Sequence, residues 1–115
     1  MRKVYVAGKY SASNGIDLLE NIRRGRRVST EILLKGDAVF CPWLDSEFFL
    51  QLRDGEKITS DLIQAHSIAW LEVSDLVYVL KDSQESKGTK AEIIRARELG
   101  IPVFFENEIQ EENHA

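Results

Sequence analysis

Two short stretches decide the fold: the apolar run Leu76-Val77-Tyr78-Val79-Leu80 and, after a loop, Ser86-Lys87-Gly88-Thr89-Lys90-Ala91-Glu92, which opens a helix. Ala96 and Leu99 follow Glu92 at i+4 and i+7, the stripe of the helix expected to pack on a sheet. Glu92 is therefore expected to point inward. A carboxylate in the first turn of a helix, at the mouth of a parallel sheet, is well placed for chemistry, and we predict that Glu92 is catalytic.

Three more apolar runs have the same character, at residues 3–8, 38–41 and 102–105. They are rich in Val, Tyr and Phe and do not alternate with polar residues, which is typical of parallel strands covered on both faces. Helical stretches at 17–35, 60–73 and 88–100 separate the four runs. Right-handed crossovers then predict a three-layer α/β fold, an open parallel sheet of flavodoxin or Rossmann type with strand order 2-1-3-4 and helices on both faces.

Small residues mark the first predicted helix. Its inward face includes Gly25 and Ser29, so we expect it to approach the sheet closely, and Gly36 is expected to end it. Gly25 costs about 1 kcal/mol of helix propensity, which close packing must offset. The second helix is expected to turn Leu62 and Trp70 inward.

Length and composition indicate one globular domain. The chain has 115 residues, 43% hydrophobic and 30% charged, and we assign the domain to 1–106 and an acidic tail to 107–115. The net charge of −4 gives no reason to expect binding to a nucleic acid polymer. Four arginines at residues 23–27 form either a solvated helix face or a contact for a phosphate or a partner.

A single cysteine, Cys41, excludes an intrachain disulfide and fits a reducing compartment. It ends an apolar run, so we interpret it as a small buried hydrophobe and not as a nucleophile. The chain begins in a strand without the apolar segment of a signal peptide, and no run approaches membrane-spanning length. We therefore expect a cytoplasmic protein without a membrane partner.

Two loops are expected to face each other across one crevice, at residues 8–15 and 81–87, because ligands bind at the carboxyl ends of the strands where winding reverses. Their amides and hydroxyls could hold an anion, although neither loop is a Walker or Gly-x-Gly-x-x-Gly motif and each could be an ordinary turn. Ser86 or Thr89 could also cap the following helix. His66 has no metal-ligand spacing around it, and we expect neither metal nor cofactor.

Two further residues allow both a structural and a functional interpretation. Asp75 precedes an apolar run and could bond locally or belong to the site. Trp43 lies in the connection 42–59, which is expected to cover the crevice, where an aromatic ring either stacks on a base or seals the core.

The ordered set of motifs resembles the nucleoside 2-deoxyribosyltransferase superfamily, and most of all its small phage and bacterial members described only as a domain of unknown function. The similar pieces are Lys3-Val4-Tyr5-Val6-Ala7-Gly8-Lys9-Tyr10-Ser11, Glu20-Asn21-Ile22-Arg23-Arg24, Cys41-Pro42-Trp43, Ser74-Asp75-Leu76-Val77-Tyr78-Val79-Leu80, Ser86-Lys87-Gly88-Thr89 with Glu92, and Leu99-Gly100-Ile101-Pro102-Val103. Lys9 stands where those proteins usually carry proline.

The resemblance implies roles for particular residues. Glu92 matches the nucleophile that attacks the anomeric carbon of a 2-deoxyribosyl group, and Ser86 matches a serine that holds the 5′-phosphate in relatives that hydrolyse deoxynucleoside monophosphates. Ser67 replaces an aspartate that helps the base leave or orients the sugar. The implied substrate-binding residues are Gly8, Tyr10, Ser11, Asn21, Trp43, Ser67, Asp75, Ser86 and Gly88.

We therefore expect cleavage of the N-glycosidic bond of a nucleoside or nucleoside 5′-monophosphate, by hydrolysis or deoxyribosyl transfer. Tyr5 or Tyr10 is expected to hold Glu92 ionised by hydrogen bonding. The partner is then a small nucleoside or nucleotide, and relatives imply a homo-oligomer. Two alternatives are a nucleotide-binding module without turnover, which Ser67 favours, and an interaction domain with no ligand site.

Overall fold

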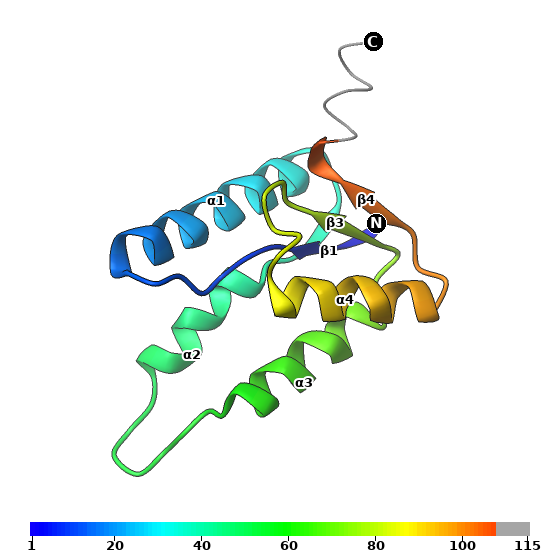
Figure 1. Ribbon diagram of the computed structural model, residues 1–115. Helices are drawn as coiled ribbons and strands as arrows, with labels where there is room; N and C mark the ends of the chain where they lie inside the picture. Colours follow the sequence, from blue (N-terminus) through cyan, green and yellow to red (C-terminus); the bar gives the residue numbers. More distant parts are fainter. Residues whose placement is uncertain (108–115) are drawn as a thin grey trace.

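Four parallel strands form the centre of the computed structural model, which describes residues 1–107 (Figure 1). They are β1 (Lys3–Ala7), β2 (Ala38–Phe40), β3 (Leu76–Val79) and β4 (Val103–Phe105). Their order is β2-β1-β3-β4, and all three pairings are parallel. The predicted fold class and strand order are confirmed.

Side chains of the central strand β1 alternate between two cores, as the pleat of a strand requires. Val4 and Val6 pack into one core beneath α1 (Gly15–Leu34), together with Val28 of that helix. Tyr5 and Ala7 pack into the other core. That core is closed by α3 (Ser60–Leu71) and α4 (Lys87–Glu98), which contribute Leu71, Ile93 and Ala96. Figure 1 shows α1 on one side of the sheet and α4 with α3 on the other, the three expected layers.

The first helix begins and ends where its capping residues stand. The Asn14 side chain accepts a hydrogen bond from the Asp17 amide at 2.8 Å, and Gly36 has φ of +102°, a conformation that favours glycine after a helix. Ser29 is buried and its hydroxyl donates to the Gly25 carbonyl at 2.7 Å.

Gly25 faces an indole and not the sheet, which corrects the expectation of a close helix–sheet approach. Trp43 belongs to a 3-10 turn, η1 (Pro42–Asp45), and is fully buried. A Cβ at Gly25 would lie 2.1 Å from the Trp43 ring, so only glycine leaves room for the indole. The helix therefore gives up propensity to accommodate a large core side chain.

The other helical faces differ from the prediction at three apolar residues. Leu62 and Trp70 of α3 are 58% and 51% exposed, and Leu99 after α4 is 42% exposed. Leu62 lies in the first turn of α3, the end of the helix that extends beyond the sheet in Figure 1, whereas the Trp70 ring stacks on Phe40 of β2 with a centroid separation of 5.9 Å. The connection before α3 contains η1 and a short helix, α2 (Ser46–Leu50), which the sequence did not predict.

The arginines of α1 all have partners on the protein itself. Arg23 and Arg27 pair with acids of the same helix, Arg24 pairs with buried Glu106, and Arg26 donates to the Trp43 carbonyl at 3.0 Å. The interpretation as a paired, solvated face is thus favoured over a free basic patch. Within residues 1–107, no helix is both long enough and apolar enough to traverse a bilayer. The predicted acidic tail, 107–115, lies outside the described residues apart from its first position.

Gly25→Ala tests the packing around the indole. We expect a loss of about 2 kcal/mol in the free energy of unfolding, because overpacking outweighs the helix propensity that alanine adds. Urea unfolding followed by circular dichroism measures the difference. The control is Gly15→Ala, at a position with nothing within 4 Å of the added methyl, where we expect a change below about 0.5 kcal/mol. Equal stability of the two variants would contradict the packing.

Candidate active site

The loops that follow β1 and β3 meet at the carboxyl ends of these neighbouring strands. The Lys9 amide donates to the Ser83 hydroxyl at 3.0 Å and ties one loop to the other. Beside them lies a cavity of about 1150 Å³. Its walls bring together seven sequence-predicted residues: Gly8, Tyr10, Ser11, Ser67, Ser86, Gly88 and Glu92.

Glu92 is 8% exposed and lines this cavity from α4. The helix starts at Ser86, whose hydroxyl accepts a hydrogen bond from the Thr89 amide at 3.3 Å. Ala96, one turn after Glu92, is fully buried, so the inward face predicted for Glu92 is the observed one. Oε1 of Glu92 lies 3.8 Å from the point where a Cβ would stand on Gly88, so the carboxylate rests beside the backbone of the first turn.

Burial dominates the electrostatics of Glu92. Loss of solvent raises the pKa of this carboxyl to about 7, and the neighbouring Tyr5 hydroxyl acts in the opposite direction. Burial and the charge of Glu92 both raise the pKa of Tyr5 above its ordinary value. Neither the Tyr5 hydroxyl nor Oε2 of Glu92 completes a hydrogen bond of normal geometry within residues 1–107. Both polar atoms are therefore available to a bound group.

Two residues predicted to bind the substrate, Asn21 and Trp43, do not line the cavity and support it indirectly. Asn21 lies outside the cavity lining, and its amide donates to the Tyr10 and Ser11 carbonyls at 3.1 Å and 3.4 Å. Trp43 is fully buried, and its indole N–H donates to the Lys9 carbonyl at 3.2 Å. Both side chains hold the loop after β1. The predicted contact of Trp43 with the substrate is corrected, because a fully buried indole offers no face to a base, and that of Asn21 stays a prediction.

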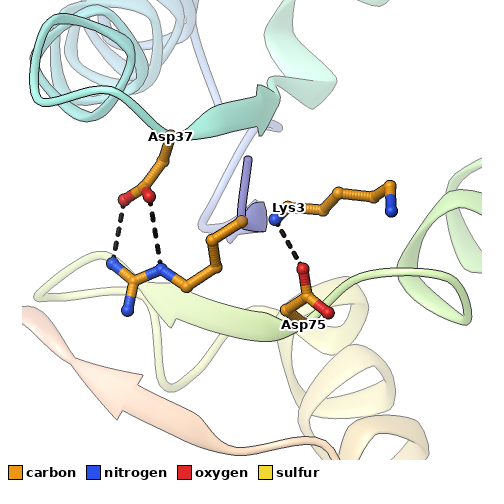
Figure 2. Close-up of polar contacts among 4 residues, drawn as sticks. Lys3, Asp37 and Asp75 are labelled. Atoms are coloured by element: carbon orange, nitrogen blue, oxygen red, sulfur yellow. Dashed lines mark hydrogen bonds and ion pairs between the residues drawn. The ribbon is translucent and has the colours of Figure 1, made fainter.

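Asp75 lies at the opposite edge of the sheet. Its carboxylate accepts a hydrogen bond from the Lys3 amide at 2.7 Å, where β1 begins, next to the pair formed by Arg2 and Asp37 (Figure 2). Parallel strands all begin at one edge and end at the other, so a residue that precedes β3 cannot reach the cavity. The predicted substrate-binding role of Asp75 is therefore corrected to a structural one.

Asp45 is the functional candidate that the sequence analysis missed. It ends η1, is 7% exposed and lines the same cavity as Glu92. Burial raises its pKa, while His66 acts to lower it. Nothing in the local sequence distinguishes Asp45 from other loop acids, since its orientation depends on how Trp43, two positions earlier, is buried.

His66 and Cys41 lie apart from Glu92, and Nδ1 of His66 is buried with no hydrogen-bond partner in residues 1–107. Both line a second cavity of about 600 Å³ beside β2, which is largely apolar. The His66 ring lies between Phe40 and Phe48, with centroid separations of 6.0 Å and 5.7 Å. Cys41 is buried. No cluster of three or more His, Cys, Asp or Glu side chains in the described residues could hold a metal ion.

The four-stranded parallel α/β sheet, of order β2-β1-β3-β4, has the same fold as a solved 2-deoxyribosyltransferase. Residues 2–106 match the family described as Domain of unknown function (DUF7768), and the chain belongs to that family. None of the curated proteins compared with the chain matches it.

Two solved structures share the fold at low sequence identity. One is a 2-deoxyribosyltransferase of the psychrotolerant bacterium Bacillus psychrosaccharolyticus, 19% identical with a TM-score of 0.62, over 90% of this chain and 70% of that protein. The other is a conserved protein of Enterococcus faecalis V583, 22% identical with a TM-score of 0.60, over 91% of this chain and 62% of that protein. The chain thus spans less than two thirds of the second protein.

The raised pKa of Glu92 predicts a pH-dependent stability. Folding favours the neutral carboxyl, so stability is full below the ordinary pKa of 4.5 and falls as the pH rises through about 7. Glu92→Gln removes this titration. We expect the variant to match the wild type at about pH 4 and to exceed it by up to about 3 kcal/mol at about pH 8, as measured by urea unfolding. Parallel pH curves for the two proteins would contradict the burial of an ionisable group.

Proposed function

We propose that this protein cleaves the N-glycosidic bond of a 2-deoxyribonucleoside or its 5′-monophosphate. The observation that carries the proposal is the buried carboxyl of Glu92 in a cavity at the carboxyl ends of β1 and β3. A cavity with a few convergent polar groups and one perturbed acid is the usual form of a small-molecule site. The likeness in fold to a 2-deoxyribosyltransferase supports this choice of chemistry.

The chemistry follows from the properties of the carboxylate. Departure of the base leaves positive charge on the sugar, and a carboxylate in a water-poor cavity stabilises such a cation far more than it would in bulk water. Ionised Glu92 attacks the anomeric carbon, and water or a second base then displaces it. The Tyr5 hydroxyl favours the ionised form of Glu92, which burial disfavours. The pKa of about 7 leaves a substantial ionised fraction at neutral pH.

The start of α4 supports a subsite for the 5′ end of the substrate. Free backbone amides of a helix N-terminus attract anions, and Ser86 and Gly88 line the cavity there. Lys9 and Lys87 also line it. A phosphate at this end would leave the anomeric carbon beside Glu92.

A second candidate function is a nucleotide-binding module without turnover. Ser67 favours it, since this buried serine lines the cavity where the resemblance places an aspartate. Such a protein would bind the same ligands and release no base. Assembly into a homo-oligomer and a cytoplasmic location, which the sequence led us to expect, stay predictions.

Glu92→Gln tests the role of the carboxylate. Wild-type protein incubated with deoxynucleosides and their 5′-monophosphates is expected to release free base, detected by liquid chromatography. The variant should lose at least about a thousandfold in rate, because the amide is a poor nucleophile, and still bind ligand. Glu85→Gln is the control, since this carboxylate lines the same cavity but is 97% exposed. Binding without base release by the wild type would favour the second candidate.

Ser86→Ala tests the proposed 5′-phosphate subsite. We expect the dissociation constant of a deoxynucleoside 5′-monophosphate to rise about tenfold, and that of the free nucleoside to change much less, because a hydrogen bond to a charged oxygen is lost. The variant also loses a helix cap, so Asn14→Ala, which removes the cap of α1, is the matched control for stability. Equal weakening of both ligands by Ser86→Ala would argue against the subsite.

A further inference from the structure

Asp45 is a buried carboxylate without a structural partner. It is 7% exposed, and none of its oxygens forms a hydrogen bond or ion pair with another residue of the described chain. It lies at the boundary of two cavities, since it lines the cavity that holds Glu92 and also the apolar cavity beside β2. Partial burial raises the pKa of this carboxyl, so hydrogen-bond donors that enter the cavity would stabilise its ionised form.

Asp45 and Glu92 both act on the hydroxyl of Tyr5, which lines the same cavity. Both carboxylates raise the pKa of the Tyr5 hydroxyl through their charge, and Asp45 also acts on Tyr10. Glu92 stands on α4 and Asp45 on η1, so the two acids enter the cavity from different segments of the chain. The cavity therefore has an end at α4 and an end at η1.

The shape of a nucleoside indicates which end of the cavity would hold the base and which would hold the 5′ group. In a nucleoside the base on C1′ and the group on C5′ project to opposite sides of the sugar. With C1′ beside Glu92 and the 5′ group toward Ser86 and Gly88, the base extends toward η1 and the start of α3. The lining there is Phe49, Ile63 and Gln64 together with Asp45, an apolar surface with two polar side chains, which suits an aromatic base.

We propose that Asp45 reads the edge of the base and selects guanine. A carboxylate offers acceptors only, and guanine is the one common base with two adjacent N–H donors on a single edge, N1–H and the 2-amino group. Two parallel hydrogen bonds would satisfy both oxygens of Asp45. Adenine, cytosine and thymine each place an acceptor next to a donor on the corresponding edge, which leaves one Asp45 oxygen facing an acceptor.

This inference rests on the proposed function only for the placement of sugar and base, and it is tested by binding. Dissociation constants for 2′-deoxyguanosine, 2′-deoxyinosine and thymidine are measured by calorimetry in the Glu92→Gln background, so that turnover does not interfere. 2′-Deoxyinosine differs from 2′-deoxyguanosine only in lacking the 2-amino group. We expect 2′-deoxyguanosine to bind about tenfold more tightly than either of the others, the discrimination typical of one good bidentate contact.

Asp45→Asn, made in the same background, should weaken 2′-deoxyguanosine about tenfold and change thymidine by less than about threefold, because the amide can accept only one of the two bonds. Asp45→Ser is the second variant if the first fails to fold, which thermal unfolding reports. Asp82→Asn is the matched control, since Asp82 is an exposed acid of the same cavity.

Two results would overturn the proposal: equal affinity of the parent for the three nucleosides, which includes no binding of any, or an equal effect of Asp45→Asn on 2′-deoxyguanosine and thymidine. The cleavage assay decides the proposed function independently. Selective binding without release of base by the wild type would refute cleavage and leave the role of Asp45 standing. Cleavage without selectivity would support the proposed function and refute the role of Asp45.

Discussion

The buried indole of Trp43 is the contact on which the site depends. It fills the space that Gly25 leaves in α1, and the same ring lies 3.0 Å from where a Cβ of Gly8 would stand. Its N–H donates to the Lys9 carbonyl, and Arg26 donates to its backbone carbonyl. One side chain thus joins the first helix, the loop after β1 and the turn after β2. These three segments carry one side of the cavity.

Both polar ends of the cavity follow from that contact. The Lys9 residue that accepts the indole N–H also donates its amide to Ser83, so the loop after β3 is fixed to the loop after β1. α4 begins directly after this second loop and presents Glu92. On the other side, Asp45 follows Trp43 by two residues in the same 3-10 turn. The distance between the two acids is therefore set by packed core contacts and not by mobile side chains.

The sequence was sufficient to predict the elements in which apolar residues follow a regular pattern. Parallel strands show as apolar runs, and the position of Glu92 one turn before Ala96 placed it on the buried face of α4. Asp75 was predicted to bind substrate, which is wrong. The sequence could have excluded this role, because a residue that precedes a strand lies at the amino ends of the strands in a parallel sheet, away from the site. Trp43 and Asp45 could not be placed, because a 3-10 turn has no hydrophobic period and takes its orientation from tertiary packing. The exposed Leu62 has a similar cause, since helical periodicity does not say how far the sheet extends beneath α3.

Two buried acids in one cavity are costly for a chain of this size. Glu92 is held with a pKa near 7 and Asp45 with a raised pKa, so each lowers the stability of the fold whenever it is ionised. Apolar side chains of similar volume would make a more stable core at both positions. Tyr5 offsets only part of this cost, because its hydroxyl acts to lower the pKa of Glu92 while burial outweighs it, and the hydroxyl itself has no hydrogen bond of normal geometry in the described chain. A ligand that brings hydrogen-bond donors and a developing positive charge supplies what all three groups lack. The instability of the empty cavity and its affinity for such a ligand then have the same physical origin.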